Sequence, residues 1–156
     1  MRIRSIKPEF WHDERLAGVS LQARLLFVGL WNLADDFGVL RGSPALIKGQ
    51  LFPFDSIDVA PLLAELEQVR RIVRYRPDGE DLILIRNFTK HQKLDRRIKA
   101  RPPLPPGYEV VEIEMADAEG KPGRALRVVE ANPVIPISAE SPRPPPNPAE
   151  SRRIPP

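Results

Sequence analysis

The sequence contains no cysteine and only two histidines, His12 and His91, which lie far apart in the chain. The first absence excludes disulfide bonds and thiolate chemistry. The histidines form no His-x-x-x-His pattern, and the single Glu-x-x-His, from Glu9 to His12, is not accompanied by a second such pair, so the sequence predicts no metal site. Asp35 and Asp36 are adjacent, so on a helix they diverge and cannot act as a paired acid and base. Glycine-rich phosphate loops and a Gly-x-Ser-x-Gly motif are also missing. We therefore expect no enzyme activity, no catalytic residue and no cofactor.

Long apolar runs are missing as well. No segment reaches the roughly 18 consecutive apolar residues that a membrane-spanning helix needs. Residues 1–11 lack the apolar centre of a signal peptide. We expect a cytoplasmic protein with no membrane partner.

Proline divides the chain into two parts. Five of the 19 prolines lie in residues 1–101, and 14 lie in residues 102–156. The first part has 18 Lys and Arg against 13 Asp and Glu, whereas the second has 6 against 8. We predict a basic folded domain over residues 1–99, which is a common domain size. A Pro-rich, mostly disordered tail is predicted over residues 100–156, with a small hairpin at residues 109–130.

A long apolar helix is expected in the first half of the domain. Ser20 is a suitable N-cap, and the helix is predicted from Leu21 to about Asp36, apolar almost all round. A short helix that begins at Pro8 precedes it. Phe10 and Trp11 are expected to cover one side of the long helix.

Shorter elements follow the long helix. Gly38 is expected to end it in a left-handed conformation, before a small strand over residues 39–41. Ser43 and Pro44 start a second helix that runs to about Leu51. A third helix, capped by Asp55 or Ser56, is predicted over residues 57–70, and its apolar face consists of Val59, Leu62, Leu63, Leu66 and Val69. Residues 72–75 and 82–85 flank a turn at residues 77–81 and predict a hairpin.

The order helix, strand, helix, helix, strand, strand is typical of a winged helix-turn-helix. The predicted fold class is therefore α+β, a winged helix-turn-helix domain with three main helices and a small β-sheet with a hairpin wing. In this fold the helix at residues 57–70 would enter the major groove of DNA. Its outward face carries the carboxylates Glu65 and Glu67, which phosphates would repel. On it, Gln68 is suited to reading adenine and Arg71 to reading guanine, although a solvated surface role is the favoured alternative for each.

A dense run of cations follows the hairpin. Between Arg86 and Arg101 there are seven Lys and Arg against one acid, Asp95. Such side chains contact phosphates without reading the base sequence. Phe88, within the run, is expected to pack on the core. The candidate DNA-binding residues are Arg2, Arg4, Lys7, Lys48, Gln68, Arg71, Arg74, Arg76, Lys90, His91, Gln92, Lys93, Arg96, Arg97, Lys99 and Arg101.

Four segments together resemble one protein family. They are MRIRSIKPEFW at the start, SLQARLLFVGLWNLADDFGVLRGSP from Ser20, LFPF from Leu51, and RRIVRYRPDGEDLILIRNFTKHQKLDRR from Arg70. In this order they resemble the N-terminal winged-helix domains of phage and prophage replication proteins, described as replisome organisers or replication initiators and common in actinobacterial genomes. The resemblance covers about residues 1–101.

The resemblance implies a module that binds double-stranded DNA in phage-type replication, inside a bacterial host cell. It also implies a replicative helicase or another replisome protein as a further partner. Larger members of the family carry a second, helical domain. Residues 102–156 contain no amphipathic helix that could form such a domain, so a role in origin binding or regulation is favoured over helicase loading.

Two alternatives stay open at the level of sequence. The first is a transcriptional regulator built on the same fold. The second is a protein-interaction module without DNA affinity, which would dock through the acidic third helix and the Pro-rich tail. The sequence predicts no oligomeric state.

Overall fold

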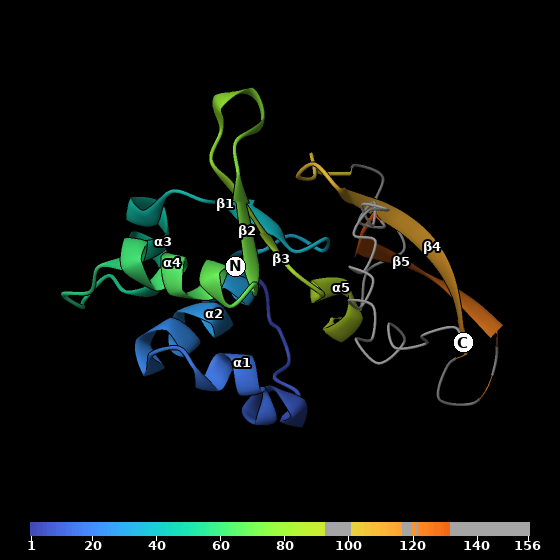
Figure 1. Cartoon of the computed structure of the whole chain (residues 1–156), viewed down its shortest axis with the longest axis horizontal. Helices are drawn as coiled ribbons and strands as arrows, with labels where there is room; N and C mark the ends of the chain where they lie inside the picture. The colour runs from blue at the N-terminus through green and yellow to red at the C-terminus, as the bar shows by residue number, and fades with distance from the viewer. Residues whose placement is uncertain (93–100, 117–119, 121, 132–156) are drawn as a thin grey trace, which may run out of the picture.

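Helices and two small antiparallel sheets build the fold (Figure 1). The computed structural model describes residues 1–92, 101–116, 120 and 122–131. The predicted α+β class is confirmed. In chain order the elements are η1 (Pro8–His12), α1 (Glu14–Ala17), α2 (Leu21–Leu33), β1 (Val39–Arg41), α3 (Pro44–Leu51), α4 (Val59–Gln68), β2 (Ile72–Tyr75), η2 (Pro77–Gly79), β3 (Leu82–Ile85), α5 (Phe88–His91), β4 (Tyr108–Ala116) and β5 (Pro122–Glu130), where η marks a 3-10 helix.

The central helix α2 begins as predicted but ends earlier. The Ser20 hydroxyl caps it by accepting a hydrogen bond from the backbone N–H of Ala23 at 3.1 Å. The helix ends at Leu33, so the predicted extension to Asp36 is wrong. The cause is the Asp35 carboxylate, which accepts hydrogen bonds from two backbone N–H groups further along the chain, those of Phe37 (2.8 Å) and Val39 (2.9 Å). This local bonding offers the backbone an alternative to the helix.

The apolar face of α4 is confirmed, but its start is not where the sequence placed it. The helix begins at Val59, and its N-cap is Asp58, whose carboxylate accepts a hydrogen bond from the Ala60 N–H at 3.0 Å. Asp55 and Ser56 therefore lie before the cap. Four of the five predicted apolar positions are buried and Val69 is half-buried. The second helix, α3, has the predicted bounds.

Phe10 covers α2, whereas Trp11 does not. The Phe10 ring packs edge-on against Trp31 at 5.4 Å between centroids and lies 6.5 Å from Phe27. The side chain of Trp11 is 71% exposed, so its predicted role as a core anchor is wrong. In the 3-10 helix η1, two consecutive side chains point in different directions, and only one can face α2.

The first sheet has the strand order β1-β3-β2, and both pairs are antiparallel. All four residues of β3 are buried. Ile83 and Ile85 belong to the core formed with the helices, while Leu82 and Leu84 face a second apolar cluster. Successive side chains of a strand point to opposite faces, so β3 is covered on both sides.

The predicted C-terminal hairpin is confirmed, and it covers the second face of this sheet. Strands β4 and β5 pair from Tyr108 with Glu130 to Ala116 with Pro122. Tyr108 and Val128 pack in the second cluster, and the Val128 N–H donates to the Thr89 hydroxyl at 3.0 Å. The β4–β5 hairpin thus packs against the folded domain through Tyr108 and Val128. The prediction of disorder from residue 132 onward falls outside the described residues.

No helix within the described part of the chain is both long enough and apolar enough to cross a bilayer.

Candidate nucleic-acid interface

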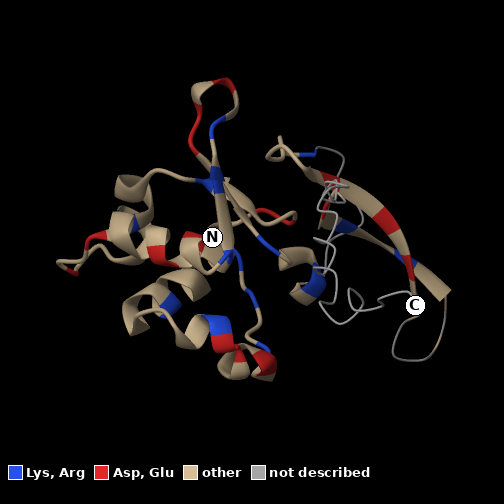
Figure 2. Ribbon diagram, in the orientation of Figure 1, with Lys and Arg blue, Asp and Glu red and all other residues tan. Residues whose placement is uncertain are grey.

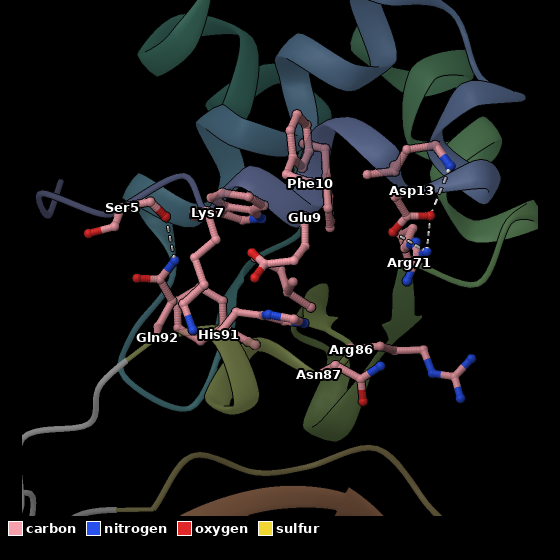
Figure 3. A pocket seen from close by; sticks show the side chains of 15 residues that line it. Ser5, Lys7, Glu9, Phe10, Asp13, Arg71, Arg86, Asn87, His91 and Gln92 are labelled. Carbon is pink, nitrogen blue, oxygen red and sulfur yellow. Dashed lines mark hydrogen bonds and ion pairs between the residues drawn. The ribbon is translucent and has the colours of Figure 1, made fainter. Parts of the chain in front are cut away.

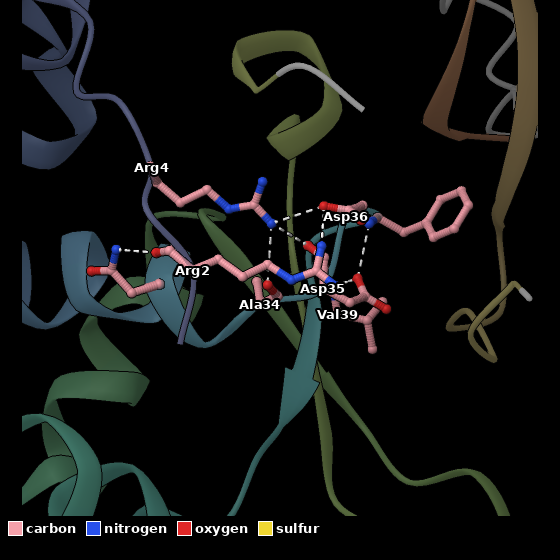
Figure 4. Close-up of polar contacts among 8 residues, drawn as sticks. Arg2, Arg4, Ala34, Asp35, Asp36 and Val39 are labelled. Atoms are coloured by element: carbon pink, nitrogen blue, oxygen red, sulfur yellow. Dashed lines mark hydrogen bonds and ion pairs between the residues drawn. The ribbon is translucent and has the colours of Figure 1, made fainter. Parts of the chain in front are cut away.

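The N-terminal segment is held against the end of α2 by two arginines (Figure 4). The Arg4 guanidinium donates to the carbonyls of Ala34 (3.3 Å) and Asp35 (3.1 Å) and to the Asp36 carboxylate (3.2 Å). Its side chain is only 8% exposed. Arg2 forms a second ion pair with Asp36. The two guanidinium groups predicted to bind DNA are therefore engaged within the protein.

The pKa values of the adjacent carboxyl groups of Asp35 and Asp36 are shifted in opposite directions. Burial raises the pKa of Asp35, against the opposing effect of the backbone hydrogen bonds from Val39 and Phe37. Burial alone would also raise the pKa of Asp36, but the hydrogen bonds and charges of Arg2 and Arg4 outweigh it. The pKa of Asp36 is consequently lowered from its ordinary value of 3.8.

The short helix α5 is anchored beside this cluster. Phe88 is 4% exposed, as expected for a core residue, and the Arg4 guanidinium lies over its ring at 5.0 Å. Gly38, with φ of +85°, allows the close approach, because a Cβ there would lie 2.6 Å from the Cβ of Phe88. The Gln92 amide then donates to the Ser5 carbonyl at 3.0 Å. These contacts place Lys90 and His91 next to the N-terminal segment.

A basic groove lies between the N-terminal segment, α5 and β5. Its volume is about 720 Å³. No acidic side chain is among the described residues that line it. Its charged or titratable lining residues are Arg4, Lys7, Lys90, His91, Arg124 and Arg127. We call this feature the basic groove, and its charge is suited to a polyanion.

A second hollow, the aromatic pocket, adjoins the basic groove (Figure 3). Its volume is about 190 Å³. The apolar lining consists of Phe10, Leu16, Phe27, Trp31, Ile85 and Phe88, and polar groups such as Glu9 and Asn87 stand around it. Ser5, Lys7, His91 and Gln92 line both the pocket and the groove.

The predicted cations that follow α4 and those on the β2–β3 hairpin are engaged in ion pairs. Arg71, proposed as a guanine reader, pairs with Asp13, the N-cap of α1. Arg74 donates through Nε to Glu67 at 2.8 Å. Arg76 contacts both oxygens of Asp81, at 2.6 and 2.9 Å. Acidic residues also lie at the tip of this hairpin (Figure 2).

Helix α4, the third helix predicted from the sequence, offers few groups to DNA. Of its two carboxylates, Glu67 pairs with Arg74. Glu65 accepts hydrogen bonds from the backbone N–H (2.7 Å) and hydroxyl (3.1 Å) of Ser20. Gln68 on α4 and Lys48 on α3 are exposed but do not line the basic groove. Both helices lie on one side of the first sheet, with β4 and β5 on the other (Figure 1).

The structure thus gathers only part of the predicted set. Arg4, Lys7, Lys90, His91 and Gln92 come together at the groove. Arg101 is exposed. The predicted contacts Lys93, Arg96, Arg97 and Lys99 lie outside the described residues.

Sequence reasoning missed Arg124 and Arg127. Both lie on β5, in the part of the chain that has more acidic than basic residues. The net negative charge of that part gave no reason to expect a cationic site there. Arg124 lies 3.8 Å from Glu112, and both side chains are more than half exposed. Such an exposed pair contributes little to stability and leaves Arg124 able to meet another anion.

Within the described residues, no group of three or more His, Asp or Glu side chains is arranged to hold a metal ion.

Comparison of the chain with protein-family models, curated proteins and solved structures finds no match. The resemblance to phage replication proteins therefore stays a prediction.

Proposed function

We propose that the protein is a non-enzymatic DNA-binding protein with a winged helix-turn-helix fold, acting in the initiation or organisation of phage-type replication. The order α2, β1, α3, α4, β2, β3 and the sheet order β1-β3-β2 support the fold. The sequence resemblance alone supports the replication setting, and mapping the bound sites in a phage or prophage genome tests it.

The observation that carries the proposal is the basic groove. Lys7, Lys90 and Arg124 are exposed there, and they come from three separate segments of the chain. Phosphate groups of a DNA backbone are the ligand that such a row of cations favours. We therefore place the DNA at the basic groove, and not at α4, which carries no Lys or Arg and whose neighbours Arg71 and Arg74 pair with carboxylates.

Binding through phosphates predicts a steep dependence on salt. If Lys7, Lys90, Arg124 and Arg127 each neutralise one phosphate, the slope of log K against log salt concentration should lie near −3.6, at about −0.9 per contact on duplex DNA. Fluorescence anisotropy with a labelled duplex at several salt concentrations measures this slope. Absence of binding even at low salt would contradict the proposal.

The affinity for DNA should also rise as the pH falls from about 7.5 to 5.5. Partial burial and the charges of Lys7 and Lys90 lower the pKa of His91 from 6.5. Among its other charged neighbours, Glu9 raises this pKa and Arg71 lowers it further. A phosphate between the two lysines would favour the protonated ring, so binding raises the pKa and takes up a proton.

The expected gain is about tenfold for each unit by which binding raises the pKa. Anisotropy titrations across this pH range measure it, with His91→Gln as the control. The variant should bind with an affinity that changes little with pH. An equal pH dependence in both proteins would exclude His91 as the source.

A further inference from the structure

The aromatic pocket and the basic groove share four lining residues, so a chain of phosphates in the groove passes the mouth of the pocket. We propose that the aromatic pocket accepts one unstacked base of the nucleic acid whose phosphates lie in the basic groove. This inference rests on the proposed DNA-binding function and specifies the form of DNA that the site takes. The DNA ligand is then a single strand, or a duplex in which a base has been unpaired.

The size and lining of the pocket fit a planar ring. An apolar protein cavity of about 150 Å³ holds a benzene ring, and this pocket has a volume of about 190 Å³. Phe10, Phe27 and Trp31 form a cluster of mutually packed rings along one side. Aromatic side chains bind bases by stacking, and this contact is tolerant of base identity.

The polar groups at the pocket suit the edge of a base better than an apolar side chain. Arg71 and Asn87 line the pocket, and both side chains carry N–H donors. Donors of this kind favour a ligand that brings acceptors, because donors left unpaired when a ligand displaces water cost free energy. The carbonyl oxygens of thymine are such acceptors.

A base within an intact duplex cannot enter the pocket, because it is paired and stacked on both faces. Entry requires a strand whose bases are already free, or the energy to unpair one. Binding should therefore favour single strands over intact duplexes of equal length. The phosphate contacts alone predict the opposite order, because a duplex presents a higher charge density.

The test compares three ligands of equal length at low salt: oligothymidylate, an abasic deoxyribose-phosphate strand, and a blunt duplex. The abasic strand is the matched control, because it keeps every phosphate and lacks the bases. Wild-type protein should bind oligothymidylate about tenfold more tightly than the abasic strand, the effect of stacking one base. The blunt duplex should bind more weakly than oligothymidylate.

A fluorescence readout locates the base. The chain has two tryptophans, and Trp11 is exposed, so Trp11→Phe leaves Trp31 in the pocket lining as the sole indole. Oligothymidylate should quench the emission of Trp31 in this variant, and the abasic strand should not. Equal affinity for the two strands, or no selective quenching, would overturn the inference while leaving DNA binding intact. Failure to bind any of the three ligands would instead overturn the proposed function.

Discussion

Replacing Asp36 with Ala is expected to lower the free energy of unfolding by about 3 kcal/mol, as found when one partner of a buried ion pair is removed. The loss leaves the Arg4 guanidinium, with its side chain only 8% exposed, without its charge partner. It also removes the ion pair to Arg2, which holds the N-terminal segment at the end of α2. Chemical denaturation monitored by tryptophan fluorescence measures the change.

The matched control is Asp55→Ala. Asp55 is exposed in the loop before α4, and no side-chain hydrogen bond or ion pair links it to the described residues. Its replacement should change stability by less than about 0.5 kcal/mol, as surface substitutions usually do. Similar losses in the two variants would show that Asp36 has no special role.

The pH dependence of the free energy of unfolding tests the same interaction between Asp36 and the two arginines. Because the pKa of Asp36 is lowered in the folded state, its contribution is fully present above the ordinary value of 3.8. It is then lost as the pH falls through the folded-state pKa. Asp35, whose pKa is raised, contributes in the opposite direction. Wild-type protein should therefore lose more stability below pH 3.8 than Asp36→Ala does.

Removing two cations of the basic groove, with the double substitution Lys90→Gln and Arg124→Gln, should weaken DNA binding about a hundredfold. The basis is a loss of about 1.4 kcal/mol for each charge-assisted hydrogen bond to a phosphate. Both side chains are exposed and line the groove, so the fold should be little affected. The salt slope should also become shallower by about two, because each neutralised phosphate contributes about one to it. Anisotropy titrations at several salt concentrations report both quantities.

The control for this variant is Arg15→Gln with Arg41→Gln. These side chains are also exposed, and neither lines the basic groove. The change in net charge is the same, so general attraction to DNA falls equally in both proteins. We expect the control to bind within about threefold of wild type, because the charges it removes are distant from the phosphates. An equal loss in both variants would place the DNA elsewhere on the molecule.

The segments that carry the family resemblance have structural roles in this chain. The Arg-x-Arg at the start and the Asp-Asp before Gly38 meet each other through Arg2, Arg4 and Asp36. Gly38 and Phe88 meet at a close approach. These motifs therefore account for how the N-terminal segment, α2 and α5 are joined. They do not by themselves indicate contact with DNA.

Local patterns in the sequence predicted the elements well, because apolar periodicity and capping act over a few residues. The bounds of α3, β2 and β3 and the existence of the β4–β5 hairpin follow from such patterns. The C-terminus of α2 and the N-terminus of α4 were not predicted correctly, because in each case an unforeseen carboxylate accepts the backbone hydrogen bonds. Asp35 stops α2 early, and Asp58 caps α4 later than the candidates chosen from the sequence.

The location of the candidate site was decided only by tertiary structure. The sequence by itself determined that the chain carries many cations, with no metal-binding or nucleophile motif among its residues. It could not distinguish cations that meet carboxylates from cations that face solvent, because ion pairs such as Arg71 with Asp13 join distant positions. Nor could it place Arg124 and Arg127 beside Lys90. That arrangement exists because the β4–β5 hairpin packs Tyr108 and Val128 on the second face of the first sheet, beside α5.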